Sequence, residues 1–317
     1  MPTTSNGWQT VGLICLSFDI QTLRRERCYI RQPIDKKRCG VRKITLETYG
    51  DNSGLDNNGA NTRYVRTANF LLAMTAVNGN TQLPRVNSDE YMVIVPPGLK
   101  VSINAAKERV LSDGNDLFIV PPGESHVEVV GRGHLVRVFS NQALDLLPLA
   151  SNHLEYAHGA PEVAALDGWP APIGGYRLRH YPLDRFVNPA LPGRAFRSSN
   201  LMVNITDVYP GPRDSKKLKP HAHQDFEQIT LTCAGRFVHH LRTPWGIDST
   251  QWQEDQHLDI GSPAALTIPA GLIHTSQAME EGCWLVDIFG PPRLDFSLMP
   301  GFVRNADEYP MPEDPTI

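Results

Sequence analysis

The chain has 317 residues, of which 41% are hydrophobic and 20% are charged, so its composition is that of a globular protein and excludes general disorder. The net charge of −4 gives no overall attraction to nucleic acid or to an anionic membrane. The longest apolar run near the start, Val11–Phe18, is too short to span a bilayer. Five widely spaced cysteines form no zinc-knuckle or redox pair, which favours reduced thiols in a cytoplasmic protein.

The first 60 residues show little regular pattern, and short β-type runs follow them. Positions 24–43 hold nine basic residues against two acidic ones; we interpret them as a solvated basic segment, with a nucleic-acid patch as the alternative. From residue 62 onward, short apolar runs alternate with Asn-Gly, Asp-Gly and Pro-Pro-Gly turns, which is typical of an all-β barrel or sandwich. The expected strands include Phe70–Val77, Tyr91–Val95, Leu117–Val120, Leu135–Phe139, Leu201–Tyr209, Gln228–Thr232, Arg236–Leu241, Ala265–Ile268 and Trp284–Phe289.

Four residues of metal-ligating type stand in the second half of the chain. His221 and His223 are two positions apart, so on a β-strand both imidazoles point to the same face. Glu227 follows four residues later, and His274 stands behind a Pro-x-Gly turn. Because neutral imidazoles and a carboxylate bind divalent first-row metals well, we predict that these four side chains hold one ion.

The two halves of the chain share a pattern. Pro-x-Gly-x-x-His occurs twice, ending at His126 and at His274, and a glutamate stands eight residues before a glycine in each half. Superimposing these features pairs Glu90 with Glu227, Pro84 with His221 and Val86 with His223. We therefore interpret the chain as two duplicated β-domains. The first copy lacks the paired histidines, and we expect it to hold no metal.

These motifs resemble those of the cupin superfamily, whose members are small jelly-roll β-barrels. The resemblance implies two signatures: Gly, five residues, His-x-His, three or four residues, Glu, six residues, Gly; and Gly, five residues, Pro-x-Gly-x-x-His, three residues, Asn. The matching residues are His221, His223 and Glu227 in the first signature, and Pro269, Gly271 and His274 in the second. The departures are Ser215 and Pro263 at the leading glycines, Gly235 one residue late, and Ala278 at the asparagine.

The resemblance covers roughly residues 62–290 and implies a bicupin with its metal site in the C-terminal domain. The predicted fold is all-β, with two jelly-roll (cupin) barrels in tandem and short helical connections. The expected boundaries are 1–60 for an N-terminal extension, 61–150 for a degenerate barrel, 151–195 for a linker, 196–300 for the metal-binding barrel and 301–317 for a C-terminal tail that wraps the surface or is mobile. Exposed sheet edges predict a homodimer.

Strand alternation predicts the walls of the pocket. Counting onward from Glu227, we expect Ile229 and Leu231 to face inward, with Ser276 on the face of His274 and Trp284 on the closing strand. Such a lining favours an aromatic or otherwise apolar substrate. The hairpin Thr243–Asp259 would either close over a ligand or pack against a neighbour.

One of the adjacent histidines His239 and His240 is expected to point into the barrel, because neighbours on a strand face opposite sides. That histidine would act as a catalytic base or as a hydrogen-bond partner of the substrate. The alternative is a histidine satisfied in the interior or at the surface.

The resemblance to ring-cleaving and diketone-type cupin dioxygenases implies a non-haem Fe(II) enzyme that binds a small chelating substrate beside O2. Glu227 would be a fourth ligand or, once displaced, a base. The alternatives are a redox-neutral enzyme with Mn or Zn (an isomerase, decarboxylase or aminohydrolase), with Ni and Co also open, and a non-catalytic ligand-binding bicupin.

Overall fold

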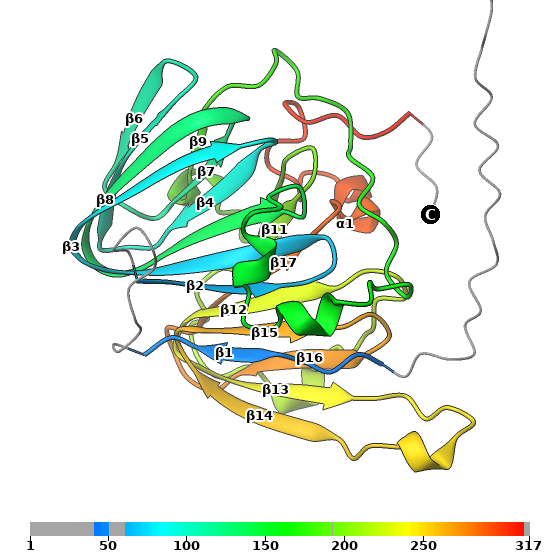
Figure 1. The fold of residues 1–317 in the computed structure, drawn as a ribbon. Coiled ribbons are helices and arrows are strands. Elements are labelled where there is room, and N and C mark those ends of the chain that lie inside the picture. Colours follow the sequence, from blue (N-terminus) through cyan, green and yellow to red (C-terminus); the bar gives the residue numbers. More distant parts are fainter. Residues whose placement is uncertain (1–40, 51–60, 192, 314–317) are drawn as a thin grey trace, which may run out of the picture. The chain divides into compact units, whose positions relative to one another are not determined.

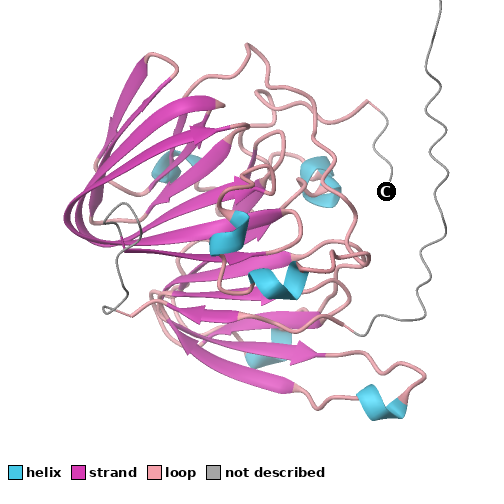
Figure 2. Cartoon of the chain, in the orientation of Figure 1, coloured by secondary structure: helices cyan, strands magenta, loops and turns pink. Residues whose placement is uncertain are grey.

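The computed structural model describes residues 41–50, 61–191 and 193–313, and most regular elements in these ranges are strands (Figure 2). All of them belong to the unit that spans residues 36–317. Most of the basic stretch 24–43 and three of the five cysteines therefore lie outside the described residues. No helix in the described ranges is long and apolar enough to cross a bilayer.

The first domain is an eight-stranded antiparallel sheet in the order β2-β3-β8-β4-β7-β9, with β5 joined to β8 and β6 joined to β5. Its strands are β2 (Asn61–Arg66), β3 (Phe70–Asn87), β4 (Tyr91–Val95), β5 (Leu99–Ala105), β6 (Glu108–Ser112), β7 (Asp116–Val120), β8 (Gly123–Ser140) and β9 (Arg179–Pro182). β3 and β8 pair over all 18 of their residues (Figure 1). The sheet curls around an apolar interior that includes Tyr91, Phe118 and Phe139.

The second domain has a six-stranded sheet in the order β1-β15-β12-β17-β11-β10 and a three-stranded sheet in the order β14-β13-β16 (Figure 1). Its strands are β1 (Leu46–Thr48), β10 (Arg194–Arg197), β11 (Met202–Ile205), β12 (Gln228–Ala234), β13 (Arg236–Arg242), β14 (Gln256–Gly261), β15 (Ala264–Ile268), β16 (Ile273–Ala278) and β17 (Trp284–Phe289). The helical elements of the two domains are α1 (Leu294–Leu298) and the 3-10 turns Leu147–Leu149, His153–Tyr156, Leu183–Phe186, Ser215–Lys217 and Ser249–Gln251.

The predicted fold of two tandem jelly-roll domains is confirmed. Two strands come from outside the ranges expected for the barrels. β1, in the expected N-terminal extension, pairs with β15 of the second domain, and β9, in the expected linker, pairs with β7 of the first. The tail was expected to wrap the surface or to be mobile, and within it Asn305 and Tyr309 are each only 1% exposed. Internal duplication is visible in the pairing: Pro84 stands opposite His126, as His221 stands opposite His274.

The largest apolar core lies between the two domains. Side chains of β3 and β4, such as Leu72 and Met92, belong to one buried cluster with Ile229 of β12 and Ile288 of β17. Burial of this surface, at about 25 cal/mol per Å2 of apolar area, joins the two sheets face to face. The strands of the second domain therefore carry one face toward the first domain and the other toward their own interior.

Two buried glutamates cross this boundary, one from each domain. Glu90, directly before β4, accepts hydrogen bonds from the Tyr309 hydroxyl (2.6 Å) and from the Ser199 backbone N–H and hydroxyl (3.3 and 3.1 Å). Glu227, directly before β12, accepts from the Tyr156 hydroxyl (2.9 Å) and the Ala68 backbone N–H (2.6 Å). Each carboxylate thus binds a turn and a tyrosine of the opposite half.

The segments that receive these glutamates are a second internal repeat. Residues 66–70 and 197–201 read Arg-Thr-Ala-Asn-Phe and Arg-Ser-Ser-Asn-Leu, and 152–156 and 305–309 both fit Asn-x-x-Glu-Tyr. Asn152 accepts from the backbone N–H of Arg66 and donates to its carbonyl, at 3.0 and 2.9 Å. Asn305 does the same with Arg197 at 3.0 and 2.9 Å. We call each set of turn, asparagine, tyrosine and crossing glutamate an inter-domain lock.

Candidate metal centre

Three histidines of the second domain meet at one site. The backbone N–H of His221 donates to the His274 carbonyl at 3.1 Å, and that of His274 donates back at 2.8 Å. The His223 carbonyl accepts from the N–H of Gly271 at 2.6 Å, within a turn where the positive φ of 81° favours glycine. One ring nitrogen from each histidine lies within 4.8 Å of the others. The two predicted motifs therefore come together as expected.

Hydrogen bonds fix the tautomers of two of these rings. The Nδ1–H groups of His221 and His274 donate to the carbonyls of Lys219 (3.1 Å) and Leu272 (3.0 Å), which leaves a lone pair on each Nε2. Burial lowers the pKa of His274 to about 4 and that of His223 to about 3. Near neutral pH these two imidazoles are therefore uncharged and able to bind a cation.

Glu227, predicted as a metal ligand or base, does not lie in the cluster of three histidines in this structure, and that role stays a prediction. Its carboxylate faces the first domain, where Tyr156 and Ala68 bind it. The physical reason is strand parity: β12 begins at Gln228, and adjacent residues of a strand point to opposite faces.

Gln228 takes the place beside the histidines. Its Oε1 accepts from His223 Nε2 at 2.9 Å, while its Nε2 donates to Thr230 Oγ1 and to Asp287 Oδ1, each at 2.7 Å. The Asp287 carboxylate thereby fixes the amide with its oxygen toward His223. A signal for this residue was present in the sequence, because six residues separate Gln228 from Gly235, as the cupin signature requires.

Strand parity also corrects three of the predicted pocket residues. Ile229, Leu231 and Trp284 belong to the core shared with the first domain and do not line the site. Ser276 does face the interior, where its hydroxyl lies 2.8 Å from Nδ1 of His239. The interior of this domain is polar, whereas that of the first domain is apolar. At equivalent strand positions, Gln228 pairs with Phe289 in the second domain and Tyr91 pairs with Phe139 in the first.

Of the two adjacent histidines, His239 is the one inside the domain. It is 1% exposed, and burial lowers its pKa to about 4. His240 points to the outer side, where its Nδ1 lies 2.8 Å from Nδ1 of His257, and its predicted catalytic role stays a prediction. His239 bonds Ser276, and its role stays a prediction.

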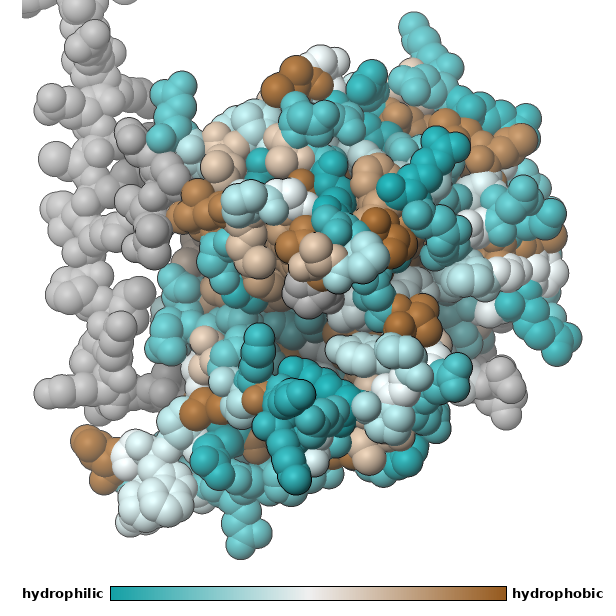
Figure 3. Space-filling view, turned by 180° about the vertical axis from the view of Figure 1, so that it is seen from behind, coloured by the Kyte–Doolittle hydropathy of each residue, from teal (hydrophilic) through white to brown (hydrophobic). Residues whose placement is uncertain are grey.

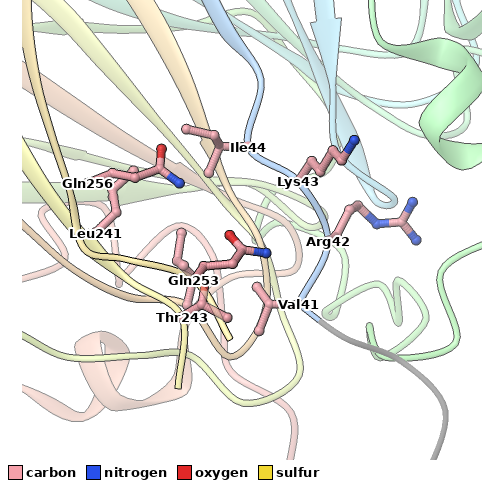
Figure 4. A pocket seen from close by; sticks show the side chains of 9 residues that line it. Val41, Arg42, Lys43, Ile44, Leu241, Thr243, Gln253 and Gln256 are labelled. Atoms are coloured by element: carbon pink, nitrogen blue, oxygen red, sulfur yellow. The ribbon is translucent and has the colours of Figure 1, made fainter. Parts of the chain in front are cut away.

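A cavity of about 290 Å3 lies between residues 41–44 and the ends of β13 and β14 (Figure 4). It borders two neighbours of His274, namely its strand partner Leu241 and its hydrogen-bond acceptor Leu272. The hairpin tip beyond it holds Trp245 and Trp252, which stack with ring centroids 4.4 Å apart. Neither tryptophan lines this cavity, whereas Thr243, Gln253 and Gln256 of the same hairpin do.

The donor set fits a metal ion. His274 Nε2 is buried and has no hydrogen-bond partner among the described residues, and such an orphaned lone pair is unfavourable unless it receives a ligand. Three imidazole nitrogens suit Zn, Cu, Fe and Ni, and a carbonyl oxygen such as that of Gln228 suits Mn. His221 is exposed, so the cluster is reached from its side.

Known structures share this architecture. A structure of protein Ylba from E. coli superimposes with a TM-score of 0.52 at 11% identity, covering 81% of this chain and 96% of that one. A mutant of Bacillus subtilis oxalate decarboxylase OxdC gives a TM-score of 0.52 at 11% identity, covering 85% and 84%. The chain has a tandem cupin fold. No family model and no curated protein matches the sequence, and at these identities the cupin structures show the fold alone.

Proposed function

We propose that this cupin is a metal-dependent enzyme in which His221, His223 and His274 bind one divalent transition metal. The observation that carries the proposal is the convergence of three ring nitrogens within 4.8 Å, with a buried Nε2 on His274 that has no hydrogen-bond partner in the described part of the chain. Such a metal would act as a Lewis acid and orient a substrate bound through oxygen atoms.

The residues around the histidines have definite tasks in this proposal. The carbonyls of Lys219 and Leu272 hold two rings in the tautomer that presents Nε2. The Gln228 amide oxygen accepts a hydrogen bond from Nε2–H of His223, which orients this ring and leaves its lone pair on Nδ1. Asp287 and Thr230 keep the amide in this orientation and exclude its rotation.

The reaction class that we propose first is dioxygenation by Fe(II) of a small substrate that chelates through two oxygens. The support is the small number of protein ligands: the three histidines of the cluster alone would leave positions for both a bidentate substrate and O2. The aromatic substrate expected from the sequence loses its basis, because the apolar walls predicted for the site lie in the inter-domain core.

A redox-neutral enzyme with Mn or Zn is the second candidate. The observation in its favour is the absence of a carboxylate from the histidine cluster within the described residues. Neutral ligands leave the ion more electrophilic, which suits isomerisation, decarboxylation or C–N hydrolysis. The expected homodimer also stays a proposal, supported by β14, which pairs only with β13 among the described strands.

Metal analysis of protein purified without chelator tests the proposal. We expect one ion per chain in the wild type and in the surface control His257→Ala, and loss of the ion in His223→Ala and His274→Ala. Equal metal content in all four proteins would refute the site. Oxygen uptake with a panel of catechols, salicylates and β-diketones then separates the candidates, since turnover without oxygen would favour the redox-neutral enzyme.

A further inference from the structure

We infer that the substrate of this centre is a small carboxylate, which binds as an anion and supplies the negative charge that the protein ligands lack. The inference rests on the proposed metal site and adds the chemical class of the substrate. Three independent features of the described residues carry it: the neutral ligand set, the guanidinium of Arg293, and the basic segment that leads to His221.

The ligand set gives a divalent ion no direct charge compensation. The three imidazoles are neutral ligands, and Gln228 presents an amide where a cupin glutamate is expected. Glu227 is engaged in the inter-domain lock, and Asp287 directs an oxygen to Gln228 and Thr230. A buried dication without an anionic partner is unfavourable, and an anionic ligand from solution relieves this cost.

Arg293, ion-paired with Asp295, places a guanidinium on the aromatic rings beside His223. The Phe226 ring stacks on His223 with centroids 4.3 Å apart, and the Arg293 guanidinium lies 5.4 Å from the centroid of the same Phe226 ring. The guanidinium also lies 3.9 Å from the centroid of Phe296. Asp295 binds Nε and Nη2 of Arg293, whereas Nη1 donates no hydrogen bond to the described residues. A planar guanidinium held by aromatic rings is well suited to a carboxylate.

The approach to the exposed histidine is basic. Lys216, Lys217 and Lys219 are exposed in the segment before His221, against one aspartate, Asp214, in the same segment. One further acidic residue, Asp225, is exposed beyond His223. The net positive charge of this segment raises the local concentration of small anions at the open side of the cluster.

Anion binding to the Co(II)-loaded protein tests the inference. Acetate and acetamide are matched in size and differ in charge, and the visible absorption of bound Co(II) reports ligands that enter its coordination sphere. We expect saturable binding of acetate and at least about tenfold weaker binding of acetamide, because close charge pairs couple strongly. Equal affinities for the two probes would overturn the inference.

Two sets of variants connect the effect to the named residues. Gln228→Glu supplies the missing charge, so we expect full cobalt content and about tenfold weaker acetate binding. Arg293→Gln should weaken acetate binding, while Arg293→Lys, which keeps the charge, should retain most of it. If Gln228→Glu does not fold, these two Arg293 variants still test the inference. Unchanged acetate affinity in cobalt-loaded Gln228→Glu and Arg293→Gln would refute this inference and leave the proposed function intact. A wild type that binds no cobalt would refute both.

Discussion

Replacing Glu227 by alanine distinguishes a metal ligand from an inter-domain lock. The carboxylate accepts from the Tyr156 hydroxyl and the Ala68 backbone N–H, and it is 3% exposed. Its removal leaves both donors without a partner, at about 1–3 kcal/mol each for buried groups. Because Tyr156 and Ala68 are partly exposed, we expect a loss of about 2–4 kcal/mol in the free energy of unfolding.

The first domain offers a matched control for this experiment. Glu90 occupies the equivalent lock and accepts from Tyr309 and Ser199, so Glu90→Ala should lower stability by a similar or larger amount. Urea unfolding gives the two free energies, and metal analysis gives the occupancy of each folded variant. We expect both variants to bind metal like the wild type. Loss of metal in Glu227→Ala but not in Glu90→Ala would show that Glu227 is a ligand after all.

Three further predictions follow from the same contacts. Burial raises the pKa of Glu227, so the folded state retains its proton above pH 4.5, and the contribution of this glutamate to stability falls as pH rises through its folded pKa. Urea unfolding should therefore show that the free energy of unfolding of Glu227→Gln increases relative to that of the wild type as pH rises through this window. A difference that stays constant with pH would contradict the shift. Gly271→Ala forces a side chain into positive φ and should cost about 1–2 kcal/mol in thermal unfolding, with weaker metal binding because this turn fastens His223. Gln228→Ala should weaken metal binding about tenfold in a competition titration with a chromophoric chelator, with His257→Ala unchanged as the control; equal affinity in both variants would exclude Gln228 from the centre.

Local pattern was sufficient for the fold and for the three histidines. The β-type runs and their turns predicted the strands, because period-two alternation and turn chemistry are properties of neighbouring residues. The spacing of His221 and His223 fixed their common face, and the Pro-x-Gly turn before His274 marked its partner strand. These predictions depend on residues close together in the chain, and the structure brings the two motifs together through a pair of backbone hydrogen bonds.

The identity of the fourth residue shows where local pattern fails. The sequence by itself determined two β-domains and a histidine cluster in the second, since strand periodicity and ligand spacing are written in consecutive residues. It also held the glycine spacing that points to Gln228, yet a shift of one residue exchanges the two faces of a strand. Only the tertiary structure decided that Glu227 faces the first domain, because its partners Tyr156 and Ala68 lie far away in the sequence and approach it only when the two sheets pack.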